Sequence, residues 1–216
     1  MVHNIAYVGA PLDREVKGVV QLPVLKIVYQ DLSGLSEIEG VLVFTSKRGI
    51  ISLRMSNVTI RSNRIYCIGE QTAHYLKKIF SLDCKVPKEQ NTEGLAALMI
   101  GTEKSITIVG SDNISKKFID KIKKNGIKVK HIIAYKIEEN TSVDYGILDQ
   151  TGALLVGSSK SFELLHRRLG EKLKGKSIYA IGKPTAKKIR SFGYEPKEIF
   201  DTPNIEAIVT ILATKR

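Results

Sequence analysis

The sequence has little of the chemistry on which metal, disulfide-rich and membrane proteins depend. It has two cysteines, Cys67 and Cys84, which form no Cys-x-x-Cys pair, and four histidines that are scattered singly. These residues give neither a disulfide scaffold nor zinc-ligand spacing. No stretch approaches the roughly 18 uncharged apolar residues of a membrane-spanning helix. We expect a cytoplasmic protein, because the first residues also lack the apolar core of a signal peptide.

Motifs of the common nucleotide-binding and hydrolytic enzymes are also missing. The chain has no Gly-x-Gly-x-x-Gly fingerprint for a dinucleotide and no Walker loop for a nucleoside triphosphate. No close Ser/His/Asp or Cys/His arrangement is visible along the sequence, although folding can assemble one from distant residues. The function must therefore be sought in the charge and in the pattern of strands and helices.

The charge is the informative part of the composition. The 216 residues are 43% hydrophobic and 26% charged, as in ordinary globular proteins, with 34 Lys and Arg against 22 Asp and Glu, for a net charge of +12. Such an excess indicates an anionic partner, which could be nucleic acid, an acidic membrane surface or a polyanionic small molecule. The densest basic stretch, Lys116–Lys130, fits either a helix with a solvated lysine face or a stripe that follows phosphates.

Short apolar runs alternate with helical patterns along most of the chain, which is typical of parallel α/β folds. We expect strands at 40–45, 64–68, 105–109, 153–156 and 177–181, and helices at about 70–80, 115–125, 183–193 and 205–213.

Two extended segments, Leu22–Tyr29 and Val129–Ile137, interrupt this alternation. They predict two crossings between domains, the first outward and the second returning. The predicted organisation is a split α/β domain (1–22 plus 141–216), an inserted α/β domain (30–130), and interdomain linker strands at 23–29 and 131–140.

An internal repeat supports two similar domains. Residues 65–73 match residues 178–186 at an offset of 113, with six of nine positions identical. Upstream, residues 40–46 match residues 152–158. Two similar α/β domains that face each other would place a binding cleft between them.

The junctions between strands and helices carry small and hydroxyl residues. Free backbone N–H groups and the positive end of the helix dipole attract anions at such junctions. The candidate residues are Thr45 and Ser46, Gly69 and Thr72, Gly110 and Ser111, Gly157, Ser158 and Ser159, and Gly182 and Thr185. Each hydroxyl could instead only cap its own helix. For five sites in two domains, we expect that at least some bind a polyanion.

An ordered set of short motifs runs over nearly the full length of the chain. The motifs are Leu22-Pro23, Phe44–Gly49, Ile68–Ala73, Glu93–Ala96, Ile108–Ser111, Gly126 with Val129 and Tyr135, Ser158-Ser159, Ala180–Ala186 and Ile205–Val209. Each motif is weak alone, but their order is specific, and it resembles the uroporphyrinogen-III synthase family.

The resemblance implies two α/β domains joined by a two-stranded linker and an enzyme of the lyase class. This family converts hydroxymethylbilane, a linear tetrapyrrole with eight carboxylates, to uroporphyrinogen III on the way to haem, sirohaem and cobalamin. The reaction loses water, closes the ring through a spirocyclic intermediate and inverts the last pyrrole, without a metal or organic cofactor. The implied partners are this polyanionic small molecule and, transiently, the preceding pathway enzyme. Nucleic acid and membrane are not partners, and a monomer is expected.

The resemblance also assigns roles to residues. It places Thr45, Ser46, Thr72, Ser158 and Thr185 along the substrate cleft, and we add Gly69, Gly110, Ser111, Ser159 and Gly182 at the same junctions as substrate-binding candidates. Tyr135 matches the linker tyrosine of the family, the candidate that assists departure of the hydroxyl as an acid or hydrogen-bond donor. Tyr135 could instead be an aromatic residue that packs the hinge.

One region departs from the family pattern. The family opens with a strand that ends in Arg-Pro, followed by a full helix, but this chain has Ala10-Pro11 and only 11 residues before Pro23. The first helix must be shortened or lost, and Arg14 is a possible substitute for the arginine. The alternative function is a non-enzymatic cleft-type binding protein for another polyanion, such as a sugar phosphate or nucleic acid.

Overall fold

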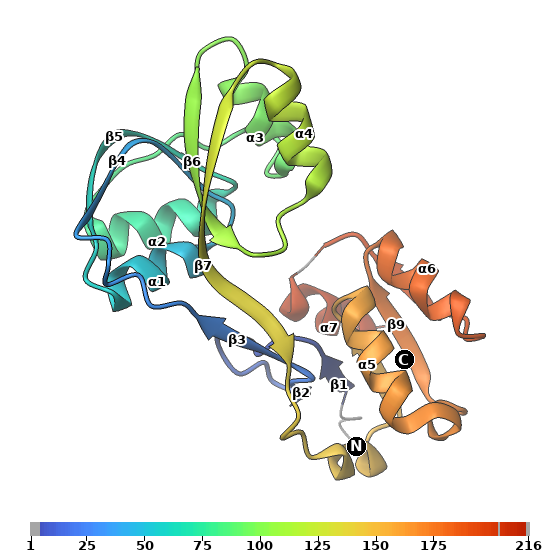
Figure 1. Ribbon diagram of the computed structural model, residues 1–216. Coiled ribbons are helices and arrows are strands. Elements are labelled where there is room, and N and C mark those ends of the chain that lie inside the picture. Colours follow the sequence, from blue (N-terminus) through green and yellow to red (C-terminus); the bar gives the residue numbers. More distant parts are fainter. Residues whose placement is uncertain (1–4, 203, 215–216) are drawn as a thin grey trace. The chain divides into compact units, whose positions relative to one another are not determined.

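The computed structural model describes residues 5–202 and 204–214 and divides the chain into two compact α/β units (Figure 1). Unit 1 contains Met1–Ile27 and Glu138–Arg216, and unit 2 is Val28–Ile137. Each unit is built on a five-stranded sheet with helices against it. The predicted α/β class with two parallel-dominated sheets is therefore confirmed.

The sheet of unit 1 has the strand order β10-β9-β8-β1-β2, and its neighbouring strands are parallel. Its strands are β1 (Ile5–Val8), β2 (Val19–Leu22), β8 (Ala153–Val156), β9 (Ser177–Ile181) and β10 (Glu198–Phe200). The run Ala153–Val156 is buried throughout, as expected for a central parallel strand covered on both faces. The sequence pattern predicts β8 and β9 with their observed bounds, whereas it misses the short edge strand β10.

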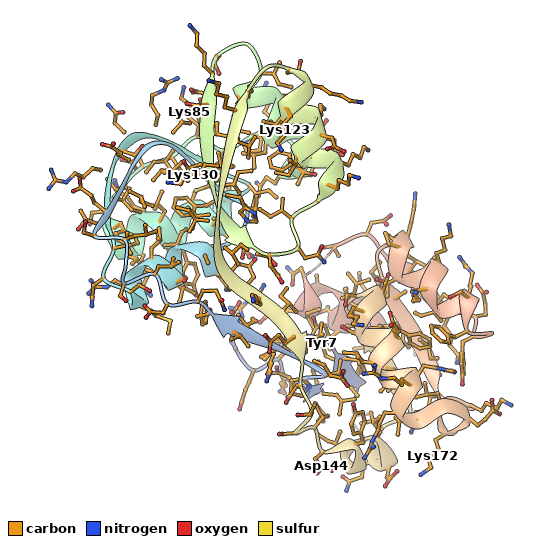
Figure 2. All side chains as sticks on the ribbon, viewed as in Figure 1. Tyr7, Lys85, Lys123, Lys130, Asp144 and Lys172 are labelled. Atoms are coloured by element: carbon orange, nitrogen blue, oxygen red, sulfur yellow. The ribbon has the colours of Figure 1, made fainter. Side chains whose placement is uncertain are left out.

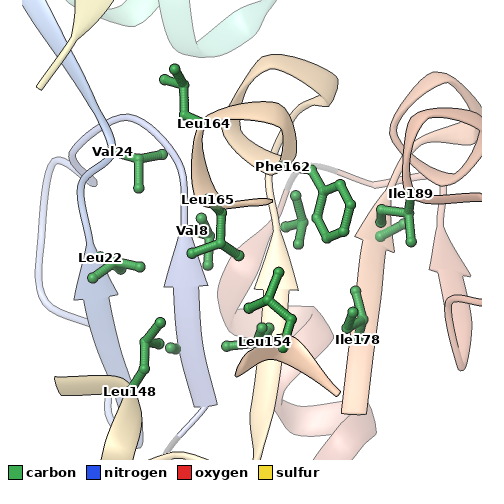
Figure 3. Close-up of a cluster of buried hydrophobic side chains, with 14 of the residues drawn as sticks. Val8, Leu22, Val24, Leu148, Leu154, Phe162, Leu164, Leu165, Ile178 and Ile189 are labelled. Carbon is green, nitrogen blue, oxygen red and sulfur yellow. The ribbon is translucent and has the colours of Figure 1, made fainter. Parts of the chain in front are cut away.

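Helices cover both faces of this sheet. On one face, α5 (Ser159–Leu169) and α6 (Lys183–Ser191) pack on a core that includes Val8, Leu154 and Phe162 (Figure 3). On the other face, α7 (Ile205–Thr214) contributes Ile208 and Leu212 to a second core with Leu155. Two short 3-10 helices, η1 (Tyr145–Gln150) and η2 (Gly170–Leu173), complete the unit.

No helix separates β1 from β2, and the chain between these strands consists of turns and bends. The sequence predicts that the first helix is shortened or lost, and the structure shows that it is lost. The loop is held instead by a hydrogen bond from the Leu12 N–H to the Gln21 side-chain oxygen, at 2.8 Å. Gly18, with φ +79°, makes the turn into β2, a backbone conformation that favours glycine.

The sheet of unit 2 has the strand order β3-β7-β6-β4-β5. Its strands are β3 (Leu25–Tyr29), β4 (Glu37–Phe44), β5 (Thr59–Cys67), β6 (Ser105–Ser111) and β7 (Lys128–Glu139). The pairs β4–β5, β4–β6 and β6–β7 are parallel. The helices are α1 (Lys47–Met55), α2 (Glu70–Phe80), α3 (Thr92–Met99) and α4 (Lys116–Lys124).

The two extended segments that interrupt the α/β pattern pair with each other as β3 and β7. The N–H of Gln30 donates to the carbonyl of Ala134, and the N–H of Asn140 donates to the carbonyl of Val24, each at 2.9 Å. As the chain advances through β3, its partner positions move backward through β7, so this pair is antiparallel. Both strands cross the boundary between the units along the chain.

The lysine-rich stretch forms α4, which buries Phe118 and Ile122 in the core of unit 2. Lys117, Lys121 and Lys124 are exposed. The interpretation of this stretch as a helix with a solvated lysine face is therefore confirmed.

A buried carboxylate fastens β6 to β5 in unit 2. Glu103 precedes β6, and its side chain is only 2% exposed. It accepts a hydrogen bond from the Tyr66 hydroxyl at 2.6 Å and an ion-paired hydrogen bond from Arg64. Burial, and then the hydrogen bond to Glu103, raises the pKa of the Tyr66 phenol. The carboxylate is thus satisfied inside the fold rather than available for catalysis.

We predict that Glu103→Gln lowers the free energy of unfolding by about 1–3 kcal/mol, because the charged acceptor of two donors is lost. Urea denaturation measures this change. The control is Glu171→Gln, which removes an exposed ion pair with Lys174 and should cost less than about 0.5 kcal/mol. Equal effects of the two variants would contradict this account of Glu103.

Candidate functional site

In unit 2, the predicted residues of the first three junctions gather at one edge of the sheet. Thr45 and Ser46 follow β4, Gly69 follows β5, and Gly110 and Ser111 end β6. Because β4, β5 and β6 are parallel neighbours, their carboxyl ends meet at the same edge. A Cβ added to Gly110 would lie 3.0 Å from the Thr45 hydroxyl oxygen, so these two junctions are in contact.

In unit 1, the remaining predicted residues gather in the same way. Ser158 and Ser159 follow β8, and Gly182 follows β9, its parallel neighbour. Thr185 lies one turn into α6. The repeated sequence therefore falls on equivalent elements of the two units: β5 with α2 in unit 2, and β9 with α6 in unit 1.

Three of the predicted hydroxyls serve local backbone. The Ser46 hydroxyl accepts from the Arg48 N–H at 3.2 Å, and the Ser158 hydroxyl accepts from the Ser161 N–H at 3.1 Å. The Ser111 hydroxyl accepts from the Asn113 N–H at 3.2 Å and donates to Asp112 Oδ1 at 3.0 Å. For Ser46 and Ser158 the capping interpretation therefore holds at least in part.

Thr72 and Thr185 differ from these serines. They occupy the third position of α2 and α6 and are only 6% and 3% exposed. Neither threonine hydroxyl has a hydrogen-bond partner among the described residues. In that part of the chain, every side-chain oxygen that is fully buried does have a hydrogen-bond partner. Both hydroxyl oxygens therefore reach solvent, although the rest of each side chain is buried.

The two helices behind these threonines also begin without a cap of their own. Their N-cap residues are Gly69 and Gly182, which have no side chain to accept a hydrogen bond. Within the described chain, the N–H groups of Lys183 and Thr185 have no acceptor. Unpaired N–H groups at the positive end of a helix dipole bind anions.

The side chain of Gln90, a residue that the sequence pattern does not indicate, covers the N-terminus of α2. The Gln90 side-chain oxygen accepts from the Glu70 N–H at 3.1 Å, at the start of α2. A Cβ added to Gly69 would lie 2.5 Å from the same oxygen. In unit 2 an amide oxygen thus already sits where a carboxylate oxygen would bind, whereas α6 has no such acceptor among the described residues.

Basic residues occupy the first turns of three helices at these edges. Lys47 and Arg48 begin α1, Lys160 lies in the first turn of α5, and Lys183 begins α6, and none of these turns has an acidic residue. Acidic residues are the stabilising choice at a helix N-terminus. Cations there strengthen the positive field instead, which favours a bound anion.

Tyr135 lies in β7, opposite Ser111 in the register of the parallel pair β6–β7. Its carbonyl accepts from the Asp112 N–H at 3.2 Å, and its residue is only 4% exposed. The structure thus places Tyr135 beside one of the predicted junctions of unit 2. Its role as an acid or as hinge packing stays a prediction.

Arg14 forms an ion pair, so it is not an unpaired substitute for the arginine that the family pattern has before its first proline. Its guanidinium donates to Glu206 Oε2 at 2.7 Å, in the first turn of α7. The charge of Arg14 is therefore balanced within unit 1.

Both cysteines are free thiols: Cys67 is the last residue of β5, and the Cys84 thiol interacts with it. The hydrogen bond from Cys67 lowers the pKa of Cys84, while the same bond and then burial raise the pKa of Cys67. In the described residues, no group of three or more His, Cys, Asp or Glu could hold a metal ion. Nor is any described helix long and apolar enough to span a membrane.

Comparison with known proteins agrees with this arrangement. The family model described as Uroporphyrinogen-III synthase HemD matches residues 12–210. The chain belongs to the uroporphyrinogen-III synthase family. The resemblance seen in the ordered motifs is therefore confirmed, and with it an enzyme family that acts on a small tetrapyrrole.

Individual relatives support the assignment to the uroporphyrinogen-III synthase family. A Methanocaldococcus jannaschii protein named "Putative uroporphyrinogen-III synthase" is 28% identical over 210 residues, which cover 89% of this chain and 86% of that protein. The fold is similar to a crystal structure of uroporphyrinogen-III synthetase from Helicobacter pylori (TM-score 0.70, 18% identity, 99% of this chain and 100% of that chain). It is also similar to a uroporphyrinogen III synthase mutant from Thermus thermophilus (TM-score 0.60, 14% identity, 97% and 98%).

We predict that Gln90→Ala exposes the Glu70 N–H at the start of α2. Hydrogen exchange at Glu70 should become faster, and stability should fall by about 0.5–2 kcal/mol, the usual cost of a lost helix cap. Hydrogen exchange followed by NMR measures the first effect and thermal unfolding the second. Gln71→Ala, at an exposed neighbouring position, is the control. Unchanged exchange in Gln90→Ala would contradict the contact.

Proposed function

We propose that this protein is a uroporphyrinogen-III synthase, a cyclising lyase that converts hydroxymethylbilane to uroporphyrinogen III. One observation carries the proposal. In a chain of this family, the repeated Gly-x-x-Thr-Ala segment gives each unit a helix that begins at a glycine, with a solvent-accessible threonine hydroxyl one turn later. The N–H groups at these helix starts and the threonine hydroxyls can donate hydrogen bonds to carboxylates, and the proposed substrate carries eight carboxylates.

Hydrogen-bond donors in a positive field suit a substrate with many carboxylates. Each carboxylate accepts several hydrogen bonds, and bonds to a charged group are each worth about 1.5–3 kcal/mol. The cations in the first turns of α1, α5 and α6 add a positive field. We propose that such contacts hold the last pyrrole ring in the orientation that leads to isomer III.

Tyr135 is the proposed aid to the first bond cleavage. When the C–O bond of the terminal hydroxymethyl group breaks, its electron pair goes to the oxygen, which takes a proton and leaves as water. A phenol that donates to this oxygen stabilises the developing charge. Because the linear tetrapyrrole also closes without an enzyme, to the uninverted isomer, the phenol need only assist this step.

The direct test is incubation of the purified protein with enzymatically generated hydroxymethylbilane, followed by chromatographic separation of isomers I and III. We predict that isomer III predominates, with the same rate in the presence of a chelator. Isomer I alone, as in a protein-free sample, would contradict the proposal. Loss of activity in chelator and its restoration by a divalent ion would contradict the absence of a metal requirement.

We predict that Thr72→Val and Thr185→Val each lower kcat/KM by about tenfold, because each removes one hydrogen bond to a charged group. Their melting temperatures should stay close to that of the wild type, because neither hydroxyl bonds to the described protein. Thr151→Val is the matched control. Thr151 is also buried, but its hydroxyl donates to the Leu148 carbonyl at 3.2 Å, so this variant should lose stability and keep activity. If Thr72→Val and Thr185→Val keep full activity and lose stability, the two threonines only cap their helices.

We predict that Tyr135→Phe folds normally, binds substrate and still favours isomer III, with turnover slowed by at most about 10²–10⁴-fold. Single-turnover kinetics with pre-formed hydroxymethylbilane measures this change. Tyr194→Phe, which loses a hydrogen bond to the Gly170 carbonyl, should keep its turnover. Wild-type turnover in Tyr135→Phe would leave the side chain as hinge packing.

A further inference from the structure

The two cysteines of unit 2 are held close together by a short strand pair. Lys85, in the segment after α2 (Figure 2), forms an isolated parallel bridge with Tyr66 of β5. The Lys85 N–H donates to the Ile65 carbonyl at 2.8 Å, and the Cys67 N–H donates to the Lys85 carbonyl at 2.9 Å. These two bonds fix the segment that contains Cys84 against the end of β5.

The directions of the side chains follow from this alignment. Successive side chains along a strand point to opposite faces. The Lys85 ammonium lies 5.8 Å from the centre of the Tyr66 ring, so these two bridge partners share one face. Cys67 and Cys84 each neighbour one of the two partners in sequence, so they share the other face. The contact between the sulfurs agrees with this placement, because the Cys67 thiol donates a hydrogen bond to the Cys84 sulfur.

The two thiols differ in their access to solvent. Cys67 is 0% exposed, whereas Cys84 is half-buried. Cys84 also lines two surface pockets, with volumes of about 500 and 300 Å³. Either pocket is far larger than the roughly 30 Å³ that one water molecule occupies. A small dissolved oxidant can therefore reach Cys84, while Cys67 is closed to it.

The contact between the thiols also favours reaction at Cys84. The hydrogen bond from Cys67 lowers the pKa of Cys84 and outweighs burial and the carboxylates of Glu70 and Asp83, which raise it. The thiolate is the form that attacks an oxidant. An accessible thiolate beside a second thiol is the usual arrangement of a redox-sensitive cysteine. Cys84 is thus suited to react first, and Cys67 to complete a disulfide.

We propose that Cys84 and Cys67 form a reversible oxidation site, at which a peroxide converts the two thiols to one disulfide. The Cys84 thiolate attacks one peroxide oxygen, and the O–O bond breaks. This gives a sulfenic acid and a hydroxide, which takes up the proton that the Cys84 thiol had released. The Cys67 sulfur then attacks the Cys84 sulfur, the S–O bond breaks, and the oxygen leaves as water with the Cys67 proton. Two thiols thus lose two electrons, and hydrogen peroxide is reduced to two molecules of water.

The disulfide would close a ring around the candidate donors of unit 2. The ring spans residues 68–83 and contains the whole of α2, with its N-cap Gly69 and with Thr72. A cross-link across such a loop restricts the unfolded chain. The oxidised protein should therefore melt at a higher temperature than the reduced protein, by about 5–10 °C.

The test treats the reduced full chain with hydrogen peroxide under native conditions. The remaining thiols are then alkylated, and mass spectrometry of the intact chain and of its peptides counts them. We expect the wild type to lose both thiols and about 2 Da, for two hydrogen atoms. The peptides that contain Cys67 and Cys84 should be linked, and dithiothreitol should separate them. The oxidised sample should also show the higher melting temperature.

Two variants separate the roles of the thiols. In Cys84→Ser, Cys67 should stay reduced in the folded protein, because the oxidant does not reach it. In Cys67→Ala, Cys84 should stop at the sulfenic acid, which dimedone traps, and its alkylation should require a higher pH than in the wild type. Melting temperatures of the reduced variants show whether each is folded. If the change at buried Cys67 prevents folding, the wild type and Cys84→Ser still decide the test.

The inference is overturned if both thiols of the native wild type stay reduced in excess peroxide. It is also overturned if the disulfide links two chains, seen as a dimer on a non-reducing gel. An oxidised protein that melts at the same or a lower temperature than the reduced one would show that the native geometry does not fit the bond, with the same consequence. Formation of isomer III by the reduced protein tests the proposed function alone, so the two proposals fail separately.

Discussion

Parallel strand pairing is the constraint on which the candidate site depends. In each sheet the parallel strands end at one edge, and the following helices begin there. This arrangement collects N–H groups, helix dipoles and short hydroxyl side chains in one place without any acidic or metal-ligating cluster among the described residues. The basic first turns of α1, α5 and α6 are unfavourable for the helices alone. They become favourable when a polyanion occupies the edge.

The two units use the same repeat differently. At α6, the N–H groups of Lys183 and Thr185 are open in the described structure, whereas at α2 the Gln90 amide already occupies the first N–H group. Under the proposed function, a substrate carboxylate at α2 would either displace Gln90 or bind beside it, next to Thr72.

Much of this could be predicted from the sequence, for identifiable reasons. The buried run at Ala153–Val156 and the Gly-x-x-Thr-Ala repeat are local signals, so they predict strands, helix starts and the equivalent place of one threonine in each unit. Gln90 could not be predicted in the same way. Gln90 reaches α2 from a loop 20 residues away. This contact is long-range, and single-sequence patterns do not encode it.

The central claim of the proposed function is that the Thr72 and Thr185 hydroxyls bind carboxylates of a tetrapyrrole. Calorimetric titration of the full chain with uroporphyrin, an octacarboxylate porphyrin, tests this claim most directly, using the wild type, Thr72→Val, Thr185→Val and the control Thr151→Val. The account predicts that the first two variants bind about tenfold more weakly, as for one lost hydrogen bond to a charged group, and that Thr151→Val binds like the wild type. Wild-type affinity in both Thr72→Val and Thr185→Val would contradict it.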